Sequence, residues 1–194
     1  MSTAPFILAS ASPRRAELLK ELNLDFQILP SNVPEVMDEY LTPFEICQLN
    51  AHRKARAVAK KHPDALVVGA DTLVFLDHEI LGKPASKAEA QHMLEQLQGK
   101  THQVVTGVTL MHLRTHQEKV FAVSTEVRFR PLTPEEIRHY LEMVNPLDKA
   151  GAYAIQEHGE MLVEEISGSF SNVVGLPVEQ LQAELKSWQD SATL

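Results

Sequence analysis

The chain has 194 residues, a length that allows one sizeable hydrophobic core or two small lobes. Its formal net charge of −8 argues against binding a nucleic-acid polymer along a broad surface, although a few local cations and a divalent metal can still hold one triphosphate. The chain shows no apolar run long enough to span a bilayer and no secretory signal pattern, and its single cysteine fits a reducing compartment.

Short apolar runs alternate with helical patterns along the chain, which is typical of an α/β protein. We find no internal repeat and no linker, so we expect one domain spanning residues 1–194, with room for two lobes. In chain order, the predicted elements are a strand at 6–9, a helix at 13–22, a strand at 26–29, a helix at 43–61, a buried strand at 65–69, strands at 73–76 and 79–81 joined by a turn at 77–78, a helix at 87–97, a hairpin of 103–113 and 119–129, a helix opening at 133–136, strands at 153–155 and 161–166, and a last helix at 176–188.

The run Ser10-Ala11-Ser12-Pro13-Arg14-Arg15 lies between the first predicted strand and the first predicted helix. Proline suits the first turn of a helix, where backbone N–H groups and the helix dipole favour anions. Arginine adds a fork of donors that matches phosphate oxygens. The run therefore predicts a phosphate-binding turn, and the alternative is a solvated arginine pair that caps a surface helix.

Asp71 and Lys83 are two further candidates. Asp71 lies just after the buried strand at 65–69, at the edge where α/β folds place ligands, and it can hold a metal or activate water. The alternative is an Asx-type turn into the next strand. Lys83 precedes a proline in a rigid loop, where it can meet a phosphate, but the run lacks the pattern of a P-loop.

Three other features of the sequence also allow a structural or functional prediction. His102 is expected to cap or pack locally rather than catalyse, and no Cys/His set has zinc spacing. Gln156 carries a paired donor and acceptor that can read a base edge. The run 168–177 is interpreted as a small-residue loop before the final helix.

Taken together and in this order, these runs resemble the Maf family of nucleotide pyrophosphatases over nearly the whole chain. The resemblance implies a two-lobed, Maf/ITPase-like α/β fold, with an elongated mixed central sheet flanked by helices and a cleft between the lobes. The matching segments are Ser-x-Ser-Pro-Arg-Arg at 10–15, Lys-Ala at 54–55, Gly-Ala-Asp-Thr at 69–72, Gly-Lys-Pro at 82–84, Thr-His-x-Val-x-Thr-Gly at 101–107, Asp-Lys-Ala-Gly-Ala-Tyr-x-Ile-Gln at 148–156 and Asn-Val-x-Gly-Leu-Pro at 172–177.

The resemblance also implies an activity, namely metal-dependent hydrolysis of a nucleoside triphosphate to the monophosphate and pyrophosphate. It implies a divalent cation, Mg²⁺ or Mn²⁺, a cytoplasmic location and a homodimer. The residues it implies are Asp71, Glu35 and Lys83 for catalysis, with Asp71 and Glu35 also holding the metal; Ser10, Ser12, Arg15, Lys54 and Lys83 for the phosphates; and Arg14, Thr72 and Gln156 for the base and sugar.

Substrate class within the family follows the last three positions. Arg14, Thr72 and Gln156 agree with the branch that hydrolyses dTTP and UTP, and modified pyrimidine nucleotides remain possible substrates. Two alternatives stay open, a 7-methyl-GTP pyrophosphatase and a nucleotide-binding regulator of cell division with weak catalysis. The chain departs from the family pattern at Val33-Pro34-Glu35, which has one acid where many members have two, and at Phe170, which replaces a common tyrosine.

Overall fold

The computed structural model describes residues 4–77 and 79–191, and the chain divides into two compact units. Unit 1 consists of Met1–Asp71, Thr106–Val123 and Gly175–Leu194, and unit 2 consists of Thr72–Val105 and Ser124–Val174. The single domain expected for residues 1–194 stays a prediction. Within the described ranges, no helix combines the length and the apolar character that crossing a membrane requires.

The described residues contain a seven-stranded mixed sheet flanked by helices, which confirms the α/β class. The strands join in the order β2-β1-β3-β5-β6-β7, and β4 pairs with β3. β1 runs parallel to β2 and β3, whereas β4 is antiparallel to β3 and β7 is antiparallel to β6. Their bounds are β1 Phe6–Leu8, β2 Phe26–Ile28, β3 Leu66–Leu76, β4 Glu79–Leu81, β5 Thr101–His112, β6 Gln117–Phe129 and β7 Val163–Ser167.

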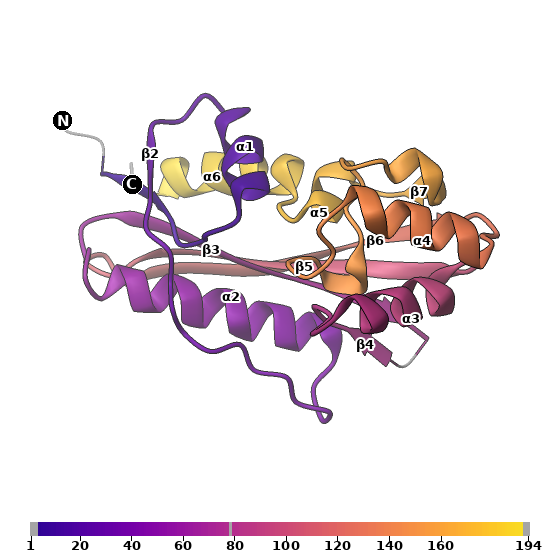
Figure 1. Cartoon of the computed structure of the whole chain (residues 1–194). Helices are drawn as coiled ribbons and strands as arrows, with labels where there is room; N and C mark the ends of the chain where they lie inside the picture. Colours follow the sequence, from indigo (N-terminus) through magenta and orange to yellow (C-terminus); the bar gives the residue numbers. More distant parts are fainter. Residues whose placement is uncertain (1–3, 78, 192–194) are drawn as a thin grey trace. The chain divides into compact units, whose positions relative to one another are not determined.

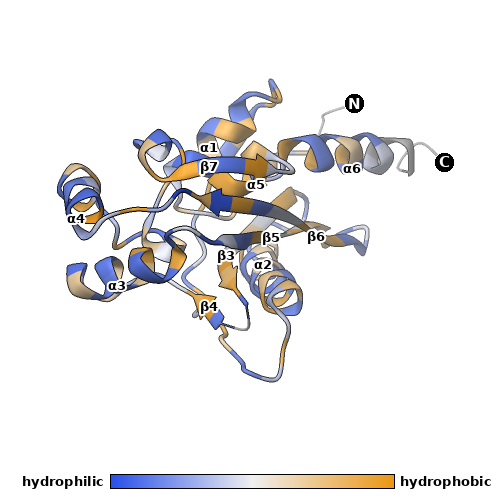
Figure 2. Ribbon diagram, turned by 90° about the vertical axis from the view of Figure 1, so that its right-hand side faces the viewer, coloured by the Kyte–Doolittle hydropathy of each residue, from blue (hydrophilic) through white to orange (hydrophobic). Residues whose placement is uncertain are grey.

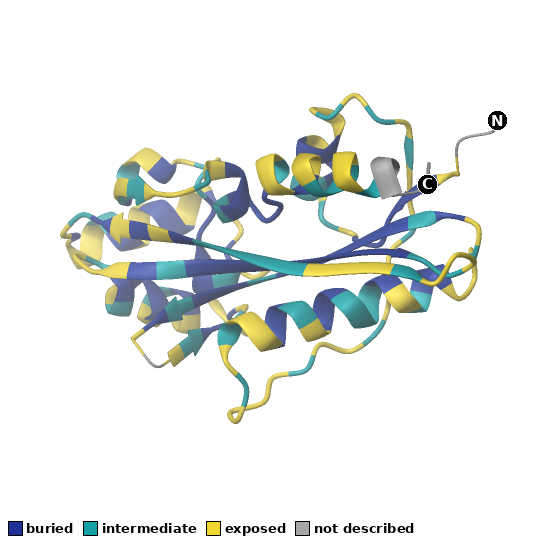
Figure 3. Cartoon of the chain, turned by 180° about the vertical axis from the view of Figure 1, so that it is seen from behind, coloured by how far each residue is buried: buried dark blue, intermediate teal, exposed yellow. Residues whose placement is uncertain are grey.

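Unit 1 holds the helices α1 (Pro13–Lys20), α2 (Pro43–Ala59) and α6 (Val178–Ser191). In Figure 1, α1 and α6 lie on one face of the first half of β3, and α2 lies on the other. α2 begins with a capping box, in which the Thr42 hydroxyl accepts from the Glu45 N–H while the Glu45 carboxylate accepts from Thr42. Buried and exposed residues alternate along this helix, the long one below the sheet in Figure 3, so one face packs into the core.

Unit 2 holds α3 (Lys87–Leu97), α4 (Pro134–Met143), α5 (Phe170–Val174) and two 3-10 turns, η1 (Ala150–Ala152) and η2 (Gly159–Met161). In Figure 2 the ribbons of α3 and α4 carry both blue and orange residues, as expected of helices with one buried face, whereas β4 is largely orange. Their apolar faces contribute to one buried cluster of this unit, which includes Leu94, Leu97, Ile137 and Tyr140.

His102 is a buried part of that unit rather than an exposed catalytic group. Its Nε2 atom lies 2.7 Å from the hydroxyl oxygen of Tyr153, and its ring meets the rings of Tyr153 and Phe129 edge to face. Burial lowers the pKa of His102 to about 4, and burial likewise raises the pKa of Tyr153. Local packing, as expected from the sequence, is what the structure shows.

Two predicted elements outside β3 are wrong. The strand expected at 153–155 is absent: Tyr153 has an extended backbone, with φ of −137° and ψ of 161°, but the chain turns from Ile155 onwards, and these residues join no strand of the described sheet. The small-residue loop expected at 168–177 contains α5, whose start is stabilised by the Ser169 hydroxyl accepting from the Asn172 N–H. The turn expected at 77–78 includes His78, which lies outside the described residues.

Candidate active site

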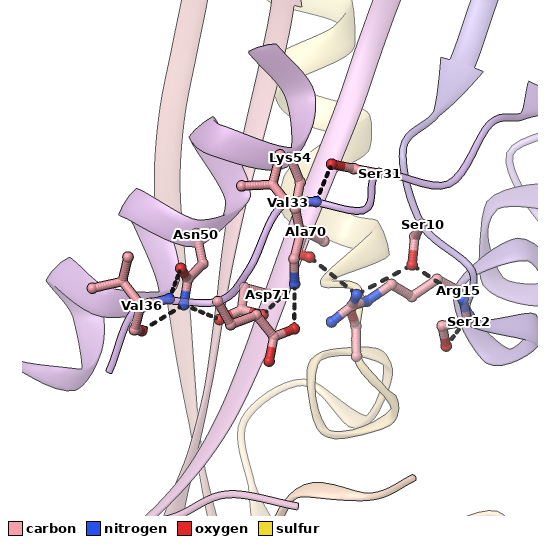
Figure 4. A network of polar contacts seen from close by, with 12 residues as sticks. Ser10, Ser12, Arg15, Ser31, Val33, Val36, Asn50, Lys54, Ala70 and Asp71 are labelled. Carbon is pink, nitrogen blue, oxygen red and sulfur yellow. Dashed lines mark hydrogen bonds and ion pairs between the residues drawn. The ribbon is translucent and has the colours of Figure 1, made fainter. Parts of the chain in front are cut away.

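The start of α1 forms a compact polar turn around Arg15 (Figure 4). The Ser12 hydroxyl caps the helix by accepting a 3.5 Å hydrogen bond from the Arg15 N–H. The Ser10 hydroxyl accepts at 3.2 Å from the Ser12 N–H and also from Nη1 of Arg15. The guanidinium also donates to the carbonyl oxygens of Ala70 at 3.0 Å and Gly175 at 2.8 Å, so it ties this turn to β3.

Asp71 lies on β3 with only 4% of its surface exposed, and both of its carboxylate oxygens accept hydrogen bonds. Oδ1 accepts from Nζ of Lys54 at 2.6 Å, and Oδ2 accepts from Nδ2 of Asn50 at 3.0 Å (Figure 4). The same Lys54 Nζ donates to Oε1 of Glu35 at 2.7 Å. Two carboxylates therefore share one ammonium group, whose side chain is itself only 11% exposed.

The charges of this site are close to balanced. Burial lowers the pKa of the Arg15 guanidinium from its ordinary value, and the negative charges of Asp71 and Glu35 oppose that shift. Because arginine keeps its proton in proteins, Arg15 and Lys54 supply two positive charges against the two carboxylates. Both carboxylates of this site therefore lie next to positive charge, which offsets the cost of burying Asp71.

Two glycines allow the backbone of α2 to pack in direct contact with β3 and β5. A Cβ atom on Gly69 would lie 2.3 Å from the carbonyl oxygen of Ala51, and one on Gly107 would lie 2.3 Å from the carbonyl carbon of Cys47. Both distances are far shorter than real Cβ contacts, so the backbone of α2 rests directly on β3 and β5. This close approach brings the polar side chains of α2 within hydrogen-bonding distance of β3.

The prediction that Asp71 follows the end of a strand is wrong. β3 runs without a break over Leu66–Leu76, so Asp71 lies near its middle. The run Gly69-Ala70-Asp71-Thr72 has the composition of a turn, which is why the sequence indicated a break. The strand continues because Asn50 and Lys54 donate hydrogen bonds to both carboxylate oxygens of Asp71. The carboxylate can therefore be buried, and the chain does not need to turn towards water at this point.

The predicted site residues divide between the two units. Six of them lie in unit 1, in the two polar networks described above, one around Arg15 and one around Lys54. Arg14 is a seventh residue of unit 1 and is half-buried in the first turn of α1. These six are Ser10, Ser12, Arg15, Glu35, Lys54 and Asp71. The other three belong to unit 2: Thr72 on β3, Lys83 exposed just after β4, and Gln156 exposed in the turn after η1.

Asn50 is a site residue that sequence reasoning missed. It is buried on α2, one turn before Lys54, and it contacts Asp71 directly. A signal was present in the sequence, because Asn50 interrupts the apolar face that Ile46, Cys47 and Ala51 form. A polar side chain on a buried helix face usually has a specific hydrogen-bonding partner.

The segment that carries Gln156 is held from within unit 2 by Lys149. This lysine is buried, and its Nζ donates to the carbonyl oxygen of Asn145 at 2.7 Å and to the carboxylates of Asp148 at 2.9 Å and Glu157 at 3.2 Å. Three acceptors around one buried ammonium fix the chain on both sides of η1. Gln156 therefore extends from an anchored turn.

Comparison with known proteins adds a family and several relatives. The model of the family described as "Maf-like protein" matches residues 5–188. A protein of Akkermansia muciniphila named "dTTP/UTP pyrophosphatase" is 49% identical, over 91% of this chain and 93% of the relative. Proteins with the same name from Bacillus velezensis and Halalkalibacterium halodurans are 47% and 48% identical, over 98% and 94% of this chain and 100% and 95% of the relatives.

Proposed function

Because the chain belongs to the Maf family, we propose that it is a nucleoside triphosphate pyrophosphatase that hydrolyses dTTP and UTP to the monophosphate and pyrophosphate. The names of the relatives, which match almost the whole chain, support the substrates. The observation that carries the reaction is the buried carboxylate of Asp71, held by Lys54 and Asn50 beside the second acid, Glu35. A carboxylate that can accept a proton, next to fixed positive charge, is the arrangement that hydrolysis of a phosphoanhydride needs.

In this mechanism Asp71 positions a water molecule and accepts its proton. The water oxygen bonds to the α phosphorus, and the bond from that phosphorus to the oxygen bridging the α and β phosphates breaks. Pyrophosphate leaves with the bridging oxygen and the electron pair of the broken bond. The hydrogen bonds from Lys54 and Asn50 hold the carboxylate in one orientation, which reduces the reorganisation needed when the water reacts.

A divalent metal fits the donor set around Lys54. Oxygens of Glu35 and Asp71 both lie within 2.7 Å of one cationic nitrogen, so two hard donors already converge on a positive charge. Mg²⁺ and Mn²⁺ prefer oxygen donors and are often held by one or two carboxylates together with substrate phosphates. In the part of the chain that the structure describes, no three His, Cys, Asp or Glu side chains cluster as a metal site. Glu35 and Asp71 would therefore hold the metal with the triphosphate, and the bound metal would stabilise charge on the phosphates.

The phosphate-binding role falls to the turn at the start of α1 and to two lysines. Arg15 supplies a guanidinium, and the N-terminus of α1 adds its dipole and its backbone N–H groups. The hydroxyls of Ser10 and Ser12 orient this turn. Lys54 and Lys83 complete the positive charge in the proposal, and Lys83 also takes part in catalysis by neutralising the leaving pyrophosphate.

Base selection is assigned to Arg14, Thr72 and Gln156. An uncharged glutamine amide can pair with the adjacent carbonyl and N–H groups of a neutral pyrimidine. The cytoplasmic location, the homodimer and the choice between Mg²⁺ and Mn²⁺ stay predictions.

The experiment that tests the proposed function is pyrophosphate release from a panel of nucleotides, with Mg²⁺ and then with Mn²⁺. Three proteins are compared: the wild type, Asp71→Asn, and Asp25→Asn as an exposed control that makes the same change elsewhere in unit 1. We expect release from dTTP and UTP, a loss of roughly a hundredfold or more in Asp71→Asn, and wild-type rates in Asp25→Asn.

Other outcomes of the panel would correct specific parts of the proposal. Release from 7-methyl-GTP alone would keep the reaction and overturn the assignment of base selection. Wild-type turnover by Asp71→Asn would overturn the role of Asp71. Tight dTTP binding without release in either metal would favour a nucleotide-binding regulator.

A further inference from the structure

Asn50 makes three hydrogen bonds from a position that is only 1% exposed. Its Oδ1 accepts from the Val36 N–H at 2.8 Å, and its Nδ2 donates both to the Val36 carbonyl at 3.0 Å and to Oδ2 of Asp71 at 3.0 Å (Figure 4). Because a carboxylate oxygen only accepts, the amide must present its nitrogen to Asp71. That orientation leaves the oxygen free to accept from the Val36 N–H.

The Val36 contacts matter because Val36 directly follows Glu35. Residues 29–42 form neither helix nor strand, so no strand ladder or helical hydrogen bonding holds Glu35 in place. The Asn50 amide instead binds both backbone groups of Val36, in the way that a neighbouring strand would. One side chain thus fixes the segment of one acid and the carboxylate of the other.

Asn50 and Lys54 connect the region of Glu35 with Asp71 in two different ways, from one face of α2. They are four residues apart, so their side chains lie on the same side of the helix. Lys54 joins the two carboxylates through charge, while Asn50 joins the backbone beside Glu35 to Asp71 through directed hydrogen bonds. An ammonium group tolerates many directions of approach, whereas an amide does not.

We propose that Asn50 is a positioning residue, which sets the placement of Glu35 relative to Asp71. This inference rests on the proposed function, since the two acids are the groups assigned to the metal and the water. In the proposal Asn50 does not touch the substrate or the water, and it holds the Asp71 carboxylate and the backbone beside Glu35. It acts through the two acids.

The test compares Asn50→Asp with Gln48→Glu, which makes the same change from amide to carboxylate on a half-buried position of the same helix. Aspartate at position 50 can still accept from the Val36 N–H, but it loses both donated hydrogen bonds and places a negative charge next to Asp71. For dTTP hydrolysis, we expect kcat to fall by roughly tenfold to a hundredfold with a much smaller change in KM. Gln48→Glu should remain within about twofold of the wild type.

Hydrogen–deuterium exchange gives a readout that does not depend on turnover. Residues 33–38 should exchange at least roughly tenfold faster in Asn50→Asp than in Gln48→Glu, because the segment is no longer held at Val36. Unchanged kcat or unchanged exchange in a folded Asn50→Asp would overturn the proposal. If no variant and no wild-type protein hydrolyses a nucleotide, the proposed function fails, and the exchange rates still decide whether Asn50 holds the segment.

If Asn50→Asp does not fold, hydrogen–deuterium exchange of the wild-type protein tests the proposal by itself. The Val36 amide should then exchange at least roughly a hundredfold more slowly than in an unstructured peptide. Exchange at the rate of an unstructured chain would show that Asn50 does not hold this segment.

Discussion

Replacing Gly107 with alanine should weaken both the fold and the active site, although Gly107 carries no chemistry. Its backbone does not adopt a left-handed conformation, so alanine is acceptable there except for the space that the new methyl group needs. That methyl group would lie 2.3 Å from the Cys47 carbonyl carbon and 2.4 Å from its oxygen, whereas ordinary contacts begin at 3.4 Å. The backbone of α2 must therefore move away from β5 by about 1 Å, the difference between 3.4 and 2.3 Å.

The consequence can be estimated from this displacement. Overpacking of a well-packed interior costs about 1–3 kcal/mol in the free energy of unfolding. Moving α2 also moves Asn50 and Lys54, whose contacts with Asp71 are only 3.0 and 2.6 Å long. A misplacement of about 1 Å can cost roughly a hundredfold in rate, or about 2.7 kcal/mol, so the loss of turnover should be comparable to the loss of stability.

Urea unfolding and pyrophosphate release from dTTP measure the two effects. Gly82→Ala is the matched control, because a Cβ there would meet nothing within 4 Å and its backbone is not left-handed. We expect the control to retain a free energy of unfolding within about 0.5 kcal/mol of the wild type. If Gly107→Ala matches the control in stability and the wild type in turnover, the close approach of α2 does not set the geometry of the site.

Two more predictions concern ionisable groups. Lys54→Met leaves the buried Asp71 charge without its closest cation, which should cost about 3 kcal/mol in the free energy of unfolding, at the lower end of the usual range because Arg15 remains nearby. Adding Asp71→Asn should recover much of that loss in urea unfolding, and no recovery would contradict the assigned ion pair. Burial lowers the pKa of His102 from 6.5 to about 4, so the unfolded chain binds a proton that the folded chain does not. The contribution of this neutral histidine to the free energy of unfolding is complete above about pH 6.5 and is lost as the pH falls towards 4, by about 3 kcal/mol in total. His102→Gln should therefore flatten the dependence of the unfolding free energy on pH between about 4 and 6.5. An unchanged slope in that variant would refute the reasoning.

The sequence predicted well those elements whose causes are local. Ser12 and Pro13 mark the start of α1, and Thr133 opens α4 through a capping box with Glu136, as the residue types indicate. The helix at 87–97 has the bounds that its apolar spacing predicts. In each case the information lies within a few residues of the feature, so no distant contact is needed to find it.

What the sequence did not predict depends on partners far along the chain. Asp71 continues a strand because Asn50 and Lys54, about twenty residues earlier, satisfy its carboxylate. The role of Gly107 follows from a helix sixty residues earlier. The grouping of Lys54 with Asp71 and Glu35 was expected only through family resemblance, and Asn50 was not expected at all, since one sequence shows a polar residue on an apolar face without showing what it meets.

The ammonium group between Glu35 and Asp71 has a consequence for how the protein is made. Two acids brought together with no counter-charge would repel each other and would need a metal ion before the surrounding chain could settle. Here Lys54 supplies that charge from within the chain, because its Nζ lies 2.7 and 2.6 Å from the two carboxylates. We therefore expect folding to proceed in cells starved of divalent cations, so that metal supply governs when the protein works rather than whether it forms.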